Sequence, residues 1–241
     1  MKANRIDEKL RNIPGGKDKI QHKCPSLRHF FLCNLPVRTV TRRTKSEQAF
    51  EAFCLQHRVA CERIPEGKHP TADYSVQLGA STVHVEVKQI DEDSQFGVLQ
   101  LRTPGAHIRA KINDSRRQLQ KSSELGFPTL LVIYNNLDPL QLFGTERHDY
   151  LAAMHGDLTL VAETYSRKIV GPYNGRNQTL RPKQNTSISA VAHLSAGGTV
   201  YSLDVYKNPY ARIPFPRGSA LPFIGLFHVS VEDMGGASKE S

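Results

Sequence analysis

Several residue types that define common protein classes are scarce in this chain of 241 residues. It has no tryptophan, only four cysteines, and no run of about 18 apolar residues such as a membrane-spanning helix needs. Its first residues are polar and include acids, unlike a secretion signal. Without such a signal disulfide bonds are not the default, and no two cysteines have the close Cys-x2-4-Cys spacing typical of zinc sites. We therefore expect a cytoplasmic protein without a membrane anchor.

Acidic residues are also comparatively few. Lysine and arginine number 32 against 23 aspartates and glutamates, which gives a net charge of +9. Basic side chains that neutralise phosphates release counterions, so this balance favours a polyanionic partner such as nucleic acid. An acidic membrane surface or an acidic protein would suit the same charge. The charge thus predicts the sign of the partner and not its identity.

The length fits one domain with extensions. Residues 1–43 are basic and interrupted by proline and glycine, and we interpret them as an N-terminal extension that either contacts nucleic acid or has no role in binding. Residues 44–234 are predicted to form one domain, with a core over 46–135 and a β-rich C-terminal part over 136–234. Residues 235–241 are predicted to be a disordered tail.

Two predicted strands carry the most informative polar residues. The segments 70–76 and 82–89 alternate apolar with polar residues, and Gly79 between them indicates a hairpin. Glu86 and Lys88 are two positions apart and share one face of the second strand. The hairpin would bring Asp73 toward the same end.

These residue types suit phosphodiester hydrolysis. Carboxylates hold Mg²⁺ through oxygen ligands, and the cation polarises a phosphoryl oxygen and lowers the pKa of its bound water. Asp73 and Glu86 would bind the cation, with the Val87 carbonyl oxygen as a further ligand. Lys88 would position or deprotonate the attacking water, or neutralise charge in the transition state.

The residues Pro70, Asp73 and Glu86-Val87-Lys88 resemble the motif of the PD-(D/E)XK nuclease superfamily, which includes restriction endonucleases and archaeal Holliday-junction resolvases. Pro70 departs from the pattern, because the proline of the family motif usually directly precedes the aspartate. The resemblance implies an α/β fold with a restriction-endonuclease-like core, in which helices flank a mixed sheet. It also implies Mg²⁺-dependent cleavage of DNA, with Mn²⁺ as a substitute, that leaves 5′-phosphate and 3′-hydroxyl ends.

The same resemblance implies a metal-binding glutamate on the helix before the first strand. Residues 46–57 have the apolar spacing of such a helix, with Ser46 as its expected N-cap. We assign the role to Glu47 on the first turn and keep Glu51 in reserve.

A second helix is predicted over 107–125, followed by a buried central strand over 129–134. Side chains at the borders of the helix's apolar stripe would face a cleft at the end of the sheet. The predicted substrate contacts are Gln89, Arg109, Lys111, Arg116 and Gln118.

The last hundred residues are less informative. We expect a helix over 150–154, a strand over 158–161, a hairpin over 187–206 that turns at 196–198, and a strand over 223–229. The segment 171–184 is predicted to be a basic surface loop.

The sequence thus favours a metal-dependent nuclease that acts on DNA and forms a possible homodimer. Two alternatives stay open: a nuclease fold that binds nucleic acid without turnover, and a basic protein-interaction subunit. The alternative interpretation of Glu86 and Lys88 themselves is a solvated strand face, with Asp73 as a turn residue.

Overall fold

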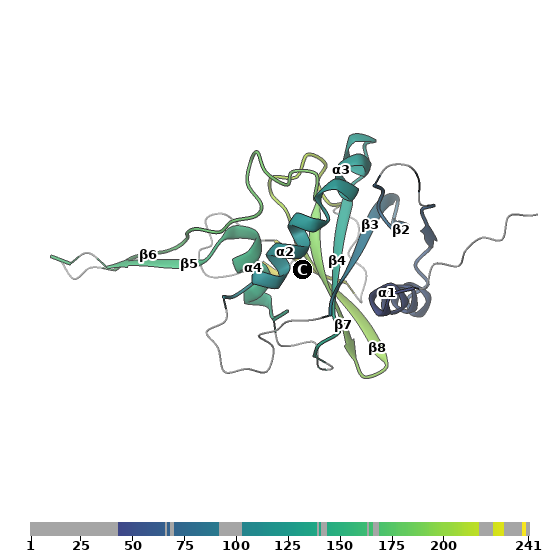
Figure 1. Ribbon diagram of the computed structural model, residues 1–241, viewed down its shortest axis with the longest axis horizontal. Coiled ribbons are helices and arrows are strands. Elements are labelled where there is room, and N and C mark those ends of the chain that lie inside the picture. The colour runs from purple at the N-terminus through teal and green to yellow at the C-terminus, as the bar shows by residue number, and fades with distance from the viewer. Residues whose placement is uncertain are drawn as a thin grey trace, which may run out of the picture. The chain divides into compact units, whose positions relative to one another are not determined.

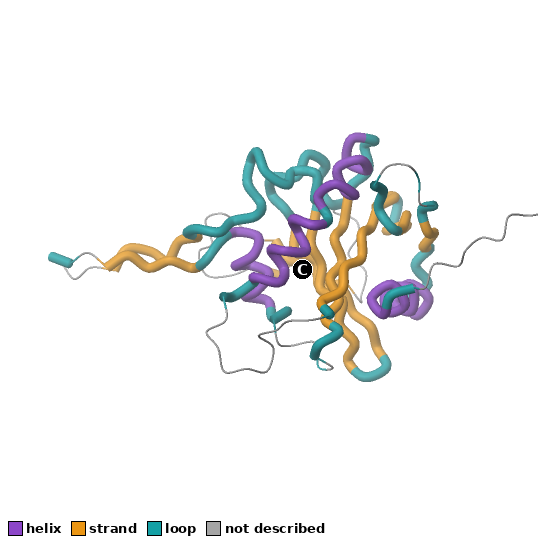
Figure 2. Tube along the Cα trace, in the orientation of Figure 1, coloured by secondary structure: helices purple, strands orange, loops and turns teal. Residues whose placement is uncertain are grey.

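The described strands form one large mixed sheet and one separate hairpin (Figures 1 and 2). In this computed structural model the large sheet has eight strands in the order β1-β2-β3-β4-β7-β8-β9-β10. Neighbouring strands are antiparallel except for the parallel pairs β3–β4, β4–β7 and β8–β9. The predicted α/β class, with a mixed sheet flanked by helices, is confirmed.

The structure describes residues 43–65, 67, 70–91, 103–138, 140, 144–162, 164–165, 169–216, 224–228 and 238–239, which belong to one unit, Arg42–Ser241. The predicted N-terminal extension lies outside them, apart from Arg43. The helices are α1 (Lys45–Gln56), α2 (Ala106–Asp114), α3 (Arg116–Glu124) and α4 (Arg147–His155). The strands are β1 (Cys61–Arg63), β2 (Tyr74–Leu78), β3 (Ser81–Ile90), β4 (Thr129–Asn135), β5 (Leu158–Ala162), β6 (Ile169–Asn174), β7 (Ala190–Gly197), β8 (Val200–Lys207), β9 (Ile224–His228) and β10 (Ser238–Lys239). None of the helices in these ranges is both long and apolar enough to cross a membrane.

Helix α1 lies on one side of the sheet and α2, α3 and α4 lie on the other (Figure 1). Each face of the sheet has its own hydrophobic core. On one face α1 packs through Phe50 and Phe53 against alternate strand residues such as Val85. On the other face α2, α3 and α4 pack against residues such as Leu131 and Ile133. Strand β4 is buried from both sides, as its continuous apolar sequence predicts. Because side chains alternate along a strand, Glu86 lies on the face of α2, α3 and α4.

The first helix begins earlier than expected. Its N-cap is Thr44 and not Ser46, because Thr44 and Glu47 form a reciprocal capping box. The Thr44 side chain accepts a hydrogen bond from the Glu47 N–H, and a Glu47 carboxylate oxygen accepts from the Thr44 N–H at 2.7 Å. The N-cap therefore fixes the side chain to which sequence analysis assigned a catalytic role.

The predicted helix over 107–125 is two helices that meet at Ser115. The Ser115 hydroxyl donates to the carbonyl oxygen of Ile112 at 3.1 Å, a local bond that competes with regular helix geometry. Two further expectations also differ from the structure. Part of the predicted loop 171–184 belongs to β6, which pairs with β5, and Ser238–Lys239 of the predicted disordered tail pair with β9. The hairpin of β7 and β8 is confirmed.

Burial of His155 gives the fold a predicted acid sensitivity. Burial lowers the pKa of this imidazole from 6.5 to about 4. Between these two pH values the unfolded chain binds a proton at His155 and the folded chain does not. The contribution of His155 to the free energy of unfolding is therefore fully present above about pH 6.5 and is lost as the pH falls toward 4. We expect a loss on the order of 3 kcal/mol from this residue. In thermal denaturation without metal, His155→Leu should show a shallower fall over that interval; an unchanged pH slope would contradict the assignment.

Candidate functional site

The hairpin of β2 and β3 places Asp73 directly beside Glu86. Tyr74 and Val85 form the first cross-strand pair of the hairpin, and Asp73, just before β2, donates its N–H to the Val85 carbonyl oxygen at 3.0 Å. Asp73 therefore lies next to Val85 and Glu86 of β3, near enough that its charge raises the pKa of Glu86. The Asp73 carboxylate accepts a hydrogen bond from the Val87 N–H at 2.8 Å, which holds it against the β3 backbone. The predicted approach of these two acids is therefore seen in the structure.

Glu86 is a carboxylate in an unfavourable setting. It is 2 % exposed, and burial followed by repulsion from Asp73 raises its pKa to about 7. Its Oε1 atom lies 2.7 Å from the Lys88 ammonium nitrogen, whose positive charge opposes that rise. Its Oε2 atom is buried and has no hydrogen-bond partner within the part of the chain that the structure describes. A buried acceptor without a donor is costly, so this oxygen is poised for a further positive ligand.

Asp73 experiences related effects. Burial raises its pKa, while the Val87 N–H and the Lys88 charge act in the opposite direction. Lys88 thus neutralises part of the charge of both acids and keeps a side chain that is 24 % exposed. The three groups form a partly accessible cluster of two carboxylates and one ammonium.

Glu47 lies close enough to contribute repulsion to both acids. Its carboxylate is nevertheless held elsewhere: Oε1 lies 2.8 Å from the Arg63 guanidinium nitrogen, and Oε2 accepts from Thr44. Glu47, Asp73 and Glu86 do not form a group with all ligand atoms within 4.8 Å in the described ranges. Direct ligation by Glu47 is therefore not seen in this geometry.

The reserve residue Glu51 has different partners. It accepts a hydrogen bond from the Tyr74 hydroxyl at 3.0 Å and forms an ion pair with Arg43 at 2.6 Å. It is not among the charges that shift the pKa of Asp73 or Glu86. Of the two helix glutamates, Glu47 is the one that acts electrostatically on the acid pair.

Two residues predicted to contact substrate, Gln89 and Arg109, have side chains that are hydrogen-bonded within the protein. Gln89 accepts a hydrogen bond from the Ser46 N–H at 2.7 Å and so joins β3 to the start of α1. Arg109 donates to the carbonyl oxygens of Pro104, Ala152 and Asn177 and forms an ion pair with Asp157. Since these acceptors belong to segments around α2 and α4, Arg109 is placed to join those segments and not to reach a substrate.

The other three helix residues are more accessible. Lys111 and Gln118 are partly exposed and Arg116 is exposed. The Gln118 side-chain oxygen is buried and has no hydrogen-bond partner among the residues described here. These residues keep their predicted role as candidate substrate contacts.

The donor set of the Asp73–Glu86 pair fits Mg²⁺. Both side chains offer oxygen, which this cation prefers, and one or two carboxylates with several waters are its usual protein environment. The observation that supports the fit is the Oε2 atom of Glu86, which has no hydrogen-bond partner within the described part of the chain. Val87 stays a candidate for a backbone oxygen ligand.

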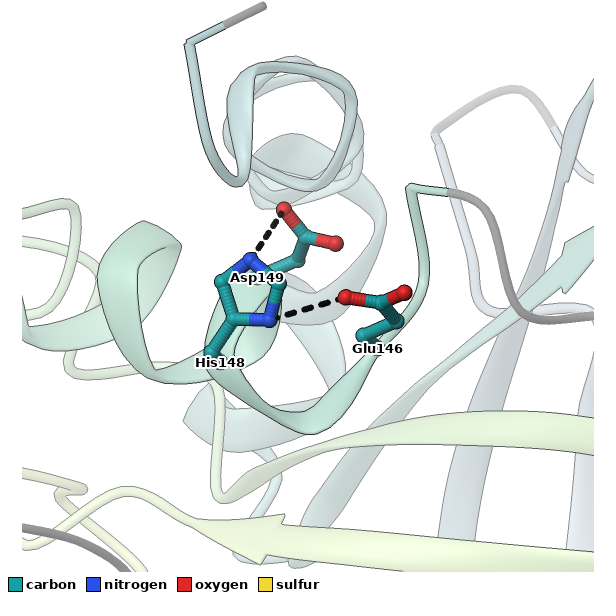
Figure 3. A group of neighbouring side chains, drawn as sticks. All are labelled: Glu146, His148 and Asp149. Atoms are coloured by element: carbon teal, nitrogen blue, oxygen red, sulfur yellow. Dashed lines mark ion pairs between the residues drawn. The ribbon is translucent and has the colours of Figure 1, made fainter.

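Sequence analysis missed a different potential metal group at the start of α4 (Figure 3). The ligand atoms of Glu146, His148 and Asp149 all lie within 4.8 Å of one another. Glu146 and His148 are exposed and interact with each other at 3.0 Å, and Asp149 accepts a hydrogen bond from the Gly105 N–H at 2.8 Å. Helical spacing of one histidine and two acids is common, so the sequence offered no distinctive signal. The imidazole nitrogen and carboxylate oxygens of this group suit transition metals better than Mg²⁺.

Comparisons with models of known protein families, with curated proteins and with solved structures found no match.

Proposed function

We propose that this protein is a divalent-metal-dependent nuclease that hydrolyses phosphodiester bonds, with DNA as its substrate. One observation carries the proposal: the buried Glu86 carboxylate has an oxygen without a hydrogen-bond partner among the described residues, stands beside a second acid, Asp73, and is paired with the ammonium of Lys88. A purely structural ion pair would need no second acid whose charge opposes the first. A bound cation would relieve that repulsion.

Each side chain has a role that its position permits. Asp73 and Glu86 would hold Mg²⁺, which when bound supplies charge stabilisation and a more acidic water. Lys88, partly exposed and next to Glu86, would hold the attacking water or neutralise charge on the phosphate. Glu47 would orient metal-bound water and not touch the metal itself, since Arg63 and Thr44 fix its carboxylate.

The order of elements supports the proposal. A helix that carries Glu47 precedes a strand entered through Asp73, a hairpin, a strand with Glu86 and Lys88, and a crossover through helices to a parallel strand. This is the order that the resemblance to PD-(D/E)XK nucleases implies for residues 46–135. The net charge of +9 suits a phosphate backbone.

The direct test is a cleavage assay with Mg²⁺ on linear, circular, single-stranded and branched DNA. We expect 5′-phosphate products from at least one of these substrates. Asp73→Asn, purified in the same way, controls for contaminating nucleases. Equal cleavage by both proteins, or none by the wild type on any substrate, would overturn the proposal.

The two glutamates of α1 give a sharper prediction. Glu47→Gln should abolish cleavage, because it removes a charge near Asp73 and Glu86 while keeping an oxygen for the Thr44 cap. Glu51→Gln should retain most of the activity, because its partners are Tyr74 and Arg43. Initial rates and melting temperatures of both variants would be measured together. The reverse ranking of rates at equal stability would move the role to Glu51.

A further inference from the structure

A second polar site lies on the same face of the sheet as Glu86 and Lys88. A cleft of about 560 Å³ is lined by residues of β7, β8 and β9 and by the start of α4. This volume is in the range of small-ligand sites. The lining residues used below are Arg147, His193, Ser202, Asp204, Tyr206 and Phe227.

Sheet register fixes where the cleft stands relative to the proposed catalytic lysine. Lys88 pairs with Ile133, Ile133 with His193, and His193 with Asp204, so these residues form one row across the sheet. Strands are about 4.8 Å apart, which puts His193 about 10 Å and Asp204 about 14 Å from Lys88. Residues in one row of a sheet point to the same face. The cleft and the proposed cleavage site therefore face the same side at short range.

His193 gives the cleft a buried polar side chain. The residue is 8 % exposed, and its Nε2 atom has no hydrogen-bond partner among the described residues. Burial lowers its pKa to about 4, so near neutral pH the ring is uncharged and offers one donor and one acceptor. A ligand that supplies a complementary donor or acceptor would satisfy this buried atom.

Aromatic groups line the same space. The rings of Tyr206 and Phe227 stack at 5.1 Å, and the Arg147 guanidinium lies 5.2 Å from the centre of the Phe227 ring. The Tyr206 ring is 3 % exposed and is covered by Tyr150 and Phe227, and the Phe227 ring is covered by Tyr206 and Arg147. The exposed, planar Arg147 guanidinium is therefore the group on which a nucleobase could stack. Two carboxylates, Glu146 and Asp204, also line the cleft. Their negative charge disfavours a phosphate there and leaves an uncharged planar group as the better occupant.

We propose that this cleft binds one nucleobase of the substrate, unpaired from its complement, about two to four nucleotides from the cleaved phosphate. The ring would lie against the Arg147 guanidinium while its edge meets His193. Since a base inside a duplex cannot enter a cleft, the enzyme would prefer single strands or duplexes with an unpaired nucleotide. This inference rests on the proposed nuclease function for its substrate but not for its binding test.

The test uses an oligonucleotide that carries 2-aminopurine at a single unpaired position, bound in Ca²⁺. Stacking in the cleft should change the 2-aminopurine fluorescence of the wild-type complex. Ser202→Phe would fill the partly exposed floor of the cleft, and Thr82→Phe on β3 is the matched control outside it. We expect Ser202→Phe to lose the signal and to lower the cleavage-rate ratio of unpaired over fully paired substrate by about tenfold or more. Thr82→Phe should change neither, and melting temperatures would verify that both variants fold.

The outcomes separate the two proposals. A signal that Ser202→Phe removes, in a protein that does not cleave, supports the base-binding cleft and rejects the nuclease. Cleavage without any 2-aminopurine signal, or with a signal and rate ratio that Ser202→Phe leaves unchanged, rejects the cleft and keeps the nuclease. His193→Leu, which removes the buried donor and acceptor, should weaken the signal as well; full retention would overturn the role of His193.

Discussion

Lys88→Ala should lower the cleavage rate at least about a hundredfold, the usual effect of removing a group that positions a proton or stabilises transition-state charge. The ammonium lies 2.7 Å from Glu86 and is partly exposed, so its loss removes a charge next to the attacked phosphate without opening the core. Single-turnover cleavage rates with saturating protein would measure the effect. DNA affinity, measured in Ca²⁺, should stay largely intact, because one lysine is a small part of the net charge of +9.

The matched control is Lys121→Ala, which removes an exposed lysine from α3. It should cleave like the wild type. If Lys88→Ala also cleaves at the wild-type rate, Glu86 and Lys88 form only a structural ion pair on the sheet. A fall shared by both variants would indicate a general loss of DNA binding and would likewise contradict the special role of Lys88.

Removal of divalent metal should abolish cleavage altogether. Without a cation, Asp73 and Glu86 repel each other and an approaching phosphate, and burial together with this repulsion raises the pKa of Glu86 to about 7. EDTA should stop the reaction, Mg²⁺ and Mn²⁺ should restore it, and Ca²⁺ should bind with little turnover because it accepts looser geometry. Full activity in EDTA would contradict the mechanism.

A binding measurement locates the metal independently of activity. A cation that binds only the folded chain raises its melting temperature as its concentration rises. Mg²⁺ should stabilise the wild type and Glu146→Gln equally, and should not stabilise Asp73→Asn. If Asp73→Asn keeps the full shift and Glu146→Gln loses it, the cation binds at Glu146, His148 and Asp149 instead.

The sequence was sufficient to predict that Asp73 and Glu86 come together, because the signals for the hairpin that joins them are local. Alternation around Gly79 predicts two strands and their hairpin, and the count of residues then sets Tyr74 opposite Val85, with Asp73 and Glu86 as the residues that follow at the open end. The continuous apolar run of β4 and the turn between β7 and β8 are also local signals, and both elements are confirmed. Ser115 shows the limit of such patterns, since the periodic segment is interrupted there and forms two helices.

The sequence by itself thus determined the α/β class, the strand face shared by Glu86 and Lys88, and the meeting of that face with Asp73. Tertiary structure decided what pairs with each charge: Arg63 with Glu47, and Asp157 with Arg109. It also decided the row that joins Lys88 to His193, because these residues are far apart in sequence and meet only through the order of strands. The physical reason is that backbone periodicity is encoded in neighbouring residues, whereas burial and charge pairing depend on which elements pack together.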